Sequence, residues 1–251
     1  MERVAHDYDD GGRSERVTQY ADLREAACRG NQDLAASGLV VGTFGNLSAV
    51  DRAAGVFAIK ASGVPYDALT PDHMVVVSLD TGRVVGGGLR PSSDTPTHLE
   101  LYRAFSCGAI VHTHSEFATM FAQTRTEIRC MGTTHADSFR GDIPVTRQLS
   151  RAEVEGEYER NTGLVIVETF RSGGLSPEEM PAVLVAQHAP FTWGADCAHA
   201  IENAKILELV ARMEWRGRLL EPGAPRPDPF LVDKHFLRKH GAKAYYGQRR
   251  P

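Results

Sequence analysis

The spacing of apolar positions in the first third of the chain changes from helical to strand-like. Apolar residues and alanines recur every three or four positions from residue 16 to residue 36, and Gly38 follows where a helix would end. GVFAIKASG (55–63) predicts a strand that runs into a glycine turn, and MVVVSLDTGRVVGGG (74–88) predicts a hairpin around Asp80-Thr81-Gly82. We therefore expect a helix followed by sheet structure up to about residue 88.

The middle of the chain carries helix-start signals ahead of two apolar runs. Thr95, suited to cap a helix, and a proline at the next position predict a helix in DTPTHLELYRAF (94–105), followed by a strand in AIVHTH (109–114). Ser150 and Glu153 have the spacing of a capping box and predict a helix that ends at Gly163. A strand is expected to follow in LVIVE (164–168).

The last third predicts a strand in AVLVAQH (182–188) and a long helix from about Asp196 to Arg216. A proline-rich connector, GAPRPDP (223–229), then leads into a basic and aromatic tail. Helices and strands alternate along the chain, and neither an internal repeat nor a low-complexity linker interrupts them. This order indicates a mixed α/β protein with a single domain.

The length of 251 residues is at the upper end for one domain and suffices for a large core. Residues 1–15, rich in Asp and Gly, predict a flexible N-terminal extension, and 16–251 predict the domain. The N-terminus lacks the apolar core of a signal peptide, and no stretch holds eighteen apolar residues in a row. The four cysteines are scattered without a C-x-x-C pair, as expected for reduced thiols in the cytoplasm.

The net charge of -4 and the isoelectric point of about 6.2 show no excess of basic residues. Nucleic-acid and anionic-membrane partners are therefore not expected, and a small-molecule substrate fits better.

Two histidines in AIVHTHSEFA (109–118) are the first candidates for chemistry. Residues i and i+2 of a strand point to the same face, so His112 and His114 would present their rings together to a metal ion. His188, at the end of a second predicted strand, is a third candidate, and three imidazoles with open positions suit a catalytic divalent ion. Taken alone, the H-x-H pair fits ordinary core or surface histidines equally well.

Seven collinear segments resemble the L-ribulose-5-phosphate 4-epimerases of the class II aldolase family. They are GNLSA, KASG, PSSDTPTHLELY, IVHTHSEFA, GTTHADSF, VLVAQHAPFTWG and HFLRKHGAKAYYGQ. The resemblance extends from about Tyr20 to Gln248. It implies a single-domain, three-layer αβα fold with a central, mainly antiparallel sheet.

The resemblance implies a metal site made by His112, His114 and His188, with Asp94 a candidate fourth ligand. Imidazole ligands accept Zn²⁺, Mn²⁺ or Co²⁺. In the related fuculose- and rhamnulose-phosphate aldolases a glutamate that serves as catalytic base usually stands at the position of Asp94, and the shorter Asp favours the epimerase branch. Capping of the following helix is the alternative role for Asp94.

The resemblance also implies a retro-aldol reaction that interconverts L-ribulose 5-phosphate and D-xylulose 5-phosphate. An oxidation–reduction route would need a nicotinamide site, and no G-x-G-x-x-G follows a strand. Asp137 and Tyr246 would be the two acid/base groups, one for each orientation of the C4 oxygen. A turn aspartate and a packed tail aromatic are their structural alternatives. In this family the tail reaches a neighbouring subunit's site within a homotetramer.

Three dipeptides match the family's phosphate-binding pairs, and a lysine would add positive charge. Each pair lies in a turn where an anion can approach closely, although such dipeptides are also common in ordinary turns. These candidate substrate-binding residues are Gly45, Asn46, Ser62, Gly63, Ser92 and Ser93, with Lys60 as the cation. The tail residues His235 and Arg238 fit either phosphate or Tyr246 contacts, or a solvated helix face.

Two positions depart from the family pattern. Ala189 stands where glycine usually follows the third histidine, and Phe44 stands where a tryptophan is usual. If position 189 required a positive φ, alanine would carry strain of about 1 kcal/mol.

Two alternatives to the epimerase remain open. One is a class II aldolase that releases its fragments, and the other is a non-catalytic, metal-binding paralogue. Retention of both candidate proton carriers argues against the paralogue.

Overall fold

The computed structural model describes residues 20–246, so the expected flexible extension at 1–15 lies outside the described residues. Its centre is a seven-stranded sheet in which every neighbouring pair is antiparallel, in the order β4-β3-β2-β1-β5-β7-β6. The strands are β1 (Asn46–Asp51), β2 (Val56–Lys60), β3 (Met74–Ser78), β4 (Val84–Gly86), β5 (Ala109–His112), β6 (Ala182–Leu184) and β7 (Pro190–Gly194).

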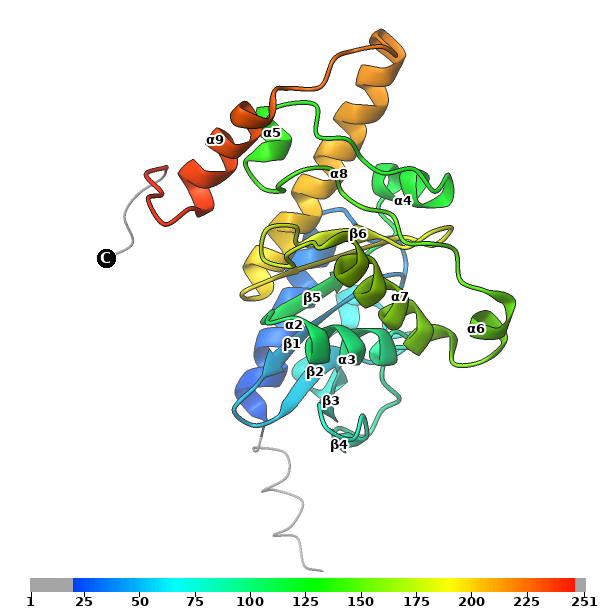
Figure 1. Cartoon of the computed structure of the whole chain (residues 1–251). Coiled ribbons are helices and arrows are strands. Elements are labelled where there is room, and N and C mark those ends of the chain that lie inside the picture. The colour runs from blue at the N-terminus through cyan, green and yellow to red at the C-terminus, as the bar shows by residue number, and fades with distance from the viewer. Residues whose placement is uncertain (1–19, 247–251) are drawn as a thin grey trace, which may run out of the picture.

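Helices cover both faces of the sheet (Figure 1). On one face, α2 (Ala21–Ala36) packs on β1 and β2, while α8 (Cys197–Leu220) packs on β5 and β7. On the other face, α3 (Thr95–Ala104) lies against α7 (Tyr158–Gly173). Strand residues alternate between the two layers: Ile59 packs in the cluster that includes α3 and α7, whereas Ala58 packs against α2. The expected three-layer αβα fold is confirmed.

The remaining elements are short and lie around this core. They are the 3₁₀ turns η1 (Tyr66–Ala68) and η2 (Pro71–His73), and the helices α4 (Glu116–Gln123), α5 (Thr133–Ala136), α6 (Arg151–Glu155) and α9 (Pro229–His240). Helix α4 packs on α8, and α9 packs on α5 at some distance from the sheet (Figure 1). Within the described range, no helix combines the length and apolar character needed to cross a membrane.

Several local predictions are confirmed. β3 and β4 form the expected hairpin, and Ser150 and Glu153 make the expected capping box at the start of α6. α8 starts where expected, because the Asp196 side chain accepts a hydrogen bond from the backbone N–H of His199 at 2.9 Å. It extends to Leu220, one turn beyond the predicted end.

The predicted strand at 164–168 is wrong, because this segment lies in the middle of α7. The preceding helix is also interrupted: α6 ends at Glu155, and α7 starts at Tyr158 and runs through Gly163. A Cβ at Gly163 would lie 2.8 Å from the Glu100 Cβ and 3.0 Å from the Thr97 carbonyl oxygen. Glycine therefore serves close packing of α7 on α3, and the β-branched run is helical because that packing overrides its strand preference.

The capping prediction at Thr95 is also wrong by one residue. Asp94 is the N-cap of α3, and its side chain makes no capping hydrogen bond. The Thr95 hydroxyl instead donates to the Ser92 carbonyl at 2.6 Å. The Asp94 carboxylate is thereby left for other contacts.

Candidate metal centre and substrate cavity

The first two histidines come from the end of β5 and the loop that follows it. His112 is the last residue of β5 and is paired with Asn46 of β1 on one side and Phe191 of β7 on the other. His114 lies beyond the end of the strand, so the prediction that one strand carries both histidines is wrong by two residues. Their ring centroids are nevertheless 5.0 Å apart.

The third histidine comes from the tight turn between β6 and β7, rather than from the end of a strand. The backbone N–H of His188 donates to Val185 O, and that of Val185 donates to Ala189 O, each at 3.0 Å. Gln187 takes a left-handed conformation, with φ of 58°, and its N–H donates to Ala122 O of α4 at 2.8 Å. The turn is thus fixed from both sides.

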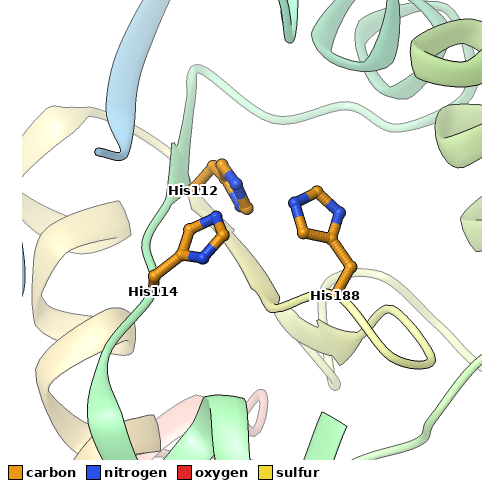
Figure 2. A group of neighbouring side chains, drawn as sticks. All are labelled: His112, His114 and His188. Atoms are coloured by element: carbon orange, nitrogen blue, oxygen red, sulfur yellow. The ribbon is translucent and has the colours of Figure 1, made fainter. Parts of the chain in front are cut away.

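The three imidazoles converge on one point (Figure 2). The His188 ring centroid lies 5.0 Å from that of His112 and 5.2 Å from that of His114. One nitrogen from each ring lies within 4.8 Å of the other two. Within residues 20–246, this is the group of His, Cys, Asp and Glu side chains whose spacing fits a metal ion.

The protonation and hydrogen bonding of these rings fit a metal. His112 Nδ1 lies 3.0 Å from Pro190 O, which favours a proton on Nδ1 and leaves Nε2 as a lone-pair donor. The buried Nδ1 of His188 has no hydrogen-bond partner among the described residues. Burial, followed by the neighbouring imidazoles, lowers the pKa of His188 to about 4, and burial and His112 lower the pKa of His114. Neutral imidazole is the form that binds a divalent ion.

Phe191 packs against the histidine cluster. Its ring is fully buried and stacks on His112, with centroids 4.2 Å apart and planes inclined by 17°. It also lies edge-on to His188 and to the buried His98, at 6.3 Å and 6.0 Å. The aromatic contact fixes the orientation of His112 together with the Pro190 hydrogen bond.

Asp94 lies beside the triad and is held by polar neighbours. Its Oδ2 accepts a hydrogen bond from Asn46 Nδ2 at 2.6 Å and lies 3.5 Å from the Ser92 hydroxyl. Burial opposes its ionisation, but electrostatic interactions with His112 and His98 and the hydrogen bond from the Asn46 amide outweigh burial and lower the pKa of Asp94. An ionised carboxylate therefore faces the site, although the metal-spaced cluster itself consists of the three histidines.

A cavity of about 370 Å³ joins the triad to all seven of the predicted substrate-binding residues. Besides the three histidines and Asp94, its walls are Thr43, Phe44, Gly45, Asn46, Lys60, Ala61, Ser62, Gly63, Ser92, Ser93, Tyr158 and Glu159. The structure thus brings together segments that are up to 145 residues apart in the sequence, from Thr43 to His188.

Lys60 supplies a cation in a buried setting. The side chain lies at the end of β2, with its Nζ 4.9 Å from the centre of the Tyr66 ring, and burial lowers its pKa. The backbone N–H groups of Ser62 and Ser92 are already bonded to Arg90 O and Lys60 O. Lys60 and the Ser62 hydroxyl are therefore better placed to bind an anion than those two amides.

Comparison with known proteins agrees with this geometry. The family described as Class II Aldolase and Adducin N-terminal domain matches residues 25–215. This chain belongs to the class II aldolase family. Two curated relatives, both called L-ribulose-5-phosphate 4-epimerase UlaF, come from Salmonella paratyphi A and Salmonella typhi. Each is 52% identical over 228 residues, covering 90% of this chain and 99% of the relative.

Solved structures share the class II aldolase fold. An L-fuculose 1-phosphate aldolase superimposes with a TM-score of 0.71 at 22% identity, covering 86% of this chain and 94% of the other. The L-fuculose-1-phosphate aldolase from Thermus thermophilus has a TM-score of 0.64 at 26% identity, covering 82% and 100%.

The two predicted proton carriers of this class II aldolase family member lie outside the histidine cavity of the same protomer. Asp137 caps the end of α5, and its carboxylate is bound by α9: Arg238 Nη2 lies 3.0 Å from both oxygens, and His235 Nδ1 lies 3.0 Å from Oδ1. Tyr246 stacks its ring 4.7 Å from the Arg238 guanidinium carbon. Arg238 therefore connects the two predicted groups. We call Asp137, His235, Arg238 and Tyr246 the α9 cluster.

Ionic contacts with Arg238 and His235 favour the ionised form of the Asp137 carboxyl group. Burial opposes its ionisation, but hydrogen bonds from Arg238 and His235 outweigh burial and hold the pKa of Asp137 below its usual range.

Tyr246 lines a different cavity, of about 600 Å³, whose walls include Trp193 and Lys239.

Sequence reasoning missed two aromatic residues of the site. Phe191 stacks on His112, and Tyr158, the first residue of α7, lies 6.3 Å from the His188 ring. Phe44, expected at the pocket wall as a departure from the family pattern, does line the cavity, with its ring 5.8 Å from that of His114. Aromatic residues are more often core than site, so spacing alone gave no signal for Tyr158 or Phe191.

The other departure, Ala189, is benign. The non-glycine residues with positive φ in the described range are Arg125 and Gln187, so position 189 makes no demand for glycine. Ala189 is fully buried, and its carbonyl closes the turn that carries His188.

Proposed function

We propose that the chain is a metal-dependent epimerase that interconverts L-ribulose 5-phosphate and D-xylulose 5-phosphate. The observation that carries the proposal is the single cavity in which three metal-spaced imidazoles face a lysine and a set of serine and glycine turns. The relatives of 52% identity support the same substrate.

The histidine triad would hold the metal, and Zn²⁺, Mn²⁺ and Co²⁺ all suit imidazole ligands. A bound divalent ion would stabilise negative charge on the ketose oxygens during C–C cleavage. Asp94 adds an ionised carboxylate next to the triad, in position to ligate the ion directly or to hold its bound water. The Asn46 amide orients that carboxylate.

The phosphate would bind at the lysine and the glycine- and serine-containing turns of the same cavity. Lys60 supplies the positive charge, and Gly45, Asn46, Ser62, Gly63, Ser92 and Ser93 complete the wall. Gly45 has a φ of 80°, and a Cβ there would lie 2.8 Å from His112 O, so glycine lets the anion-binding turn lie directly against the metal-bearing strand.

The reaction opens and re-forms the C3–C4 bond. A base removes the C4 hydroxyl proton, the C3–C4 electron pair stays on C3 as an enediolate, and C4 becomes the aldehyde carbon of glycolaldehyde phosphate. The aldehyde then turns over, C3 attacks its opposite face, and the C4 oxygen takes a proton from an acid. Two acid/base groups on opposite sides of C4 are needed.

We assign these roles to Asp137 and Tyr246, acting at the site of a neighbouring subunit. Because neither residue lines the histidine cavity of its own chain, this assignment makes the assembly part of catalysis, and a homotetramer would bring the α9 cluster to a neighbour's triad. The depressed pKa keeps Asp137 ionised at neutral pH, which is the form that can accept a proton. Arg238 contacts the Tyr246 ring and binds the Asp137 carboxylate, so one side chain positions both groups.

A cytoplasmic enzyme with residues 16–251 as one catalytic domain completes the proposal. A class II aldolase that releases its fragments is the second candidate, favoured by the L-fuculose-1-phosphate aldolases among the similar structures.

A product assay separates the two candidates. Metal-loaded protein is incubated with L-ribulose 5-phosphate, and both D-xylulose 5-phosphate and free glycolaldehyde phosphate are measured, with a chelator-treated control. The proposal predicts D-xylulose 5-phosphate only in the metal-loaded sample. Free aldehyde without the epimer would establish the aldolase, and a His112→Ala variant that kept every activity of the native protein would support the non-catalytic paralogue.

A further inference from the structure

Two aromatic side chains border the metal triad without belonging to the core. The Phe44 ring lies 5.8 Å from His114, and the Tyr158 ring lies 6.3 Å from His188. They come from different parts of the fold: Phe44 from the loop before β1, and Tyr158 from the first turn of α7. Both line the substrate cavity. Phe44 therefore lies beside His114, and Tyr158 lies beside His188.

The backbone of Phe44 is fixed although its ring is not packed. Gly45 lies so close to β5 that a Cβ would be 2.8 Å from His112 O, and the Tyr66 hydroxyl donates to Phe44 O at 3.3 Å. The Phe44 side chain is nevertheless 62% exposed. This large, exposed apolar ring lines a polar cavity and adds little to the core, so it is available to contact what enters the cavity.

The proposed reaction has a step for which such a ring is suited. Between cleavage and rejoining, the aldehyde fragment is no longer covalently attached, and it must turn over before it escapes. Lys60 and the phosphate-binding turns hold only its phosphate end. The aldehyde end needs a wall that excludes water, offers no competing hydrogen bond, and allows rotation, which an aromatic face provides.

We infer that Phe44 and Tyr158 form the wall that retains glycolaldehyde phosphate between C–C cleavage and rejoining, and so set the ratio of epimerisation to fragment release. The inference rests on the proposed epimerase function. The covalent steps are those already given, and the aromatic pair takes no proton and forms no bond. It acts on the competition between rotation and escape.

Isotope exchange measures that competition directly. Metal-loaded protein is incubated with L-ribulose 5-phosphate and an excess of ¹³C-labelled glycolaldehyde phosphate. Label enters the pentulose phosphate only after an unlabelled fragment has escaped. The ratio of label incorporated to epimer formed is measured within one sample, so it does not change with the folded or metal-loaded fraction.

Phe44→Ala is expected to raise this ratio about tenfold, equivalent to about 1.4 kcal/mol of lost retention. Phe44→Trp should keep it at or below the native value, and Tyr158→Phe should stay close to native while Tyr158→Ala rises. Val41→Ala is the matched control, because Val41 lies in the same loop, is 73% exposed, and is absent from the cavity wall. Its ratio should equal the native one.

Three results would overturn the inference in distinguishable ways. If Phe44→Ala and Tyr158→Ala both epimerise with a native ratio, the retention wall is wrong and the epimerase function stands. If native protein forms no D-xylulose 5-phosphate, the proposed function fails first, and the retention wall fails with it. If Phe44→Ala loses all turnover, the ratio is measured in Tyr158→Ala and Phe44→Leu instead. Native ratios in both variants would refute the inference that these residues retain the aldehyde.

Discussion

The histidine cavity and the α9 cluster are built in opposite ways. The cavity is formed by strand ends and tight turns on a buried sheet, and burial lowers the pKa values of His114 and His188. The α9 cluster is held by charge: Asp137, His235 and Arg238 have partly exposed side chains, and Phe236 is the buried residue of α9. The histidine triad is therefore preorganised within one chain. The predicted proton carriers lie at the end of α5 and beyond the end of α9, and Arg238 of α9 contacts both of them.

This difference predicts that mutations in the two regions impair different properties of the protein. Damage to the cavity should remove metal, while damage to the α9 cluster should leave the metal in place and change proton transfer.

The largest effect is expected from removing a metal ligand. His112→Ala should lose bound metal and lower kcat/KM on the order of 10³-fold or more, because a bound divalent ion stabilises the charge that develops in cleavage. Metal content measured by mass spectrometry and epimerisation rate check this. His73→Ala is the matched control, since the His73 side chain contacts Thr70 in a surface turn and belongs neither to the triad nor to the cavity wall. Native metal content in His112→Ala would refute the site.

A smaller effect is expected from the α9 cluster. Arg238→Ala removes the hydrogen bonds that hold Asp137 and should lower kcat/KM about 100-fold with metal content unchanged. The pKa of Asp137 should rise, so the acidic limb of the kcat/KM profile should move to higher pH. Arg151→Ala, which removes an exposed pair with Glu155, is the control. A pH profile of kcat/KM that keeps its native shape would show that Asp137 takes no part in proton transfer.

The same variant has a pH-dependent stability effect. The pKa of folded Asp137 is depressed, so its contribution to stability is present above its unfolded pKa of about 4 and disappears as pH falls through the lower, folded value. The difference in unfolding free energy between native protein and Arg238→Ala should be largest near neutral pH and shrink below pH 4. Denaturant unfolding at several pH values measures it. A difference that grows on acidification would contradict this assignment.

The smallest effect concerns position 189. Ala189→Gly should lower the unfolding free energy by about 1 kcal/mol, because glycine removes a buried methyl group and adds unfolded-state entropy where no positive φ is required. Urea unfolding gives the difference, and metal content should stay native. A stabilised variant would mean that the turn does favour glycine.

Much of the cavity could be predicted from the sequence through its resemblance to the class II aldolase family. That resemblance singled out Gly45, Lys60 and Ser62, and the structure places each of them in the cavity wall, at the end of a strand or in a turn. The capping box at Ser150, by contrast, is a local feature.

The errors arise where distant contacts decide. Packing on α3 makes residues 164–168 helical despite their β-branched side chains. The His188 turn depends on Gln187 in a left-handed conformation, held by a hydrogen bond to Ala122. Neither contact has a local sequence signal, and the same holds for Tyr158 beside His188 and for the pairing of Asp137 with Arg238.

The most direct test of the account is a stoichiometric metal titration. Chelator-treated protein receives Zn²⁺, Mn²⁺ or Co²⁺ in steps, and the rate of D-xylulose 5-phosphate formation from L-ribulose 5-phosphate is measured after each step. The account predicts a rate that starts near zero, rises linearly, and levels off at about one ion per chain. Full epimerisation by metal-free protein, or a titration that is unchanged in His112→Ala, would contradict it.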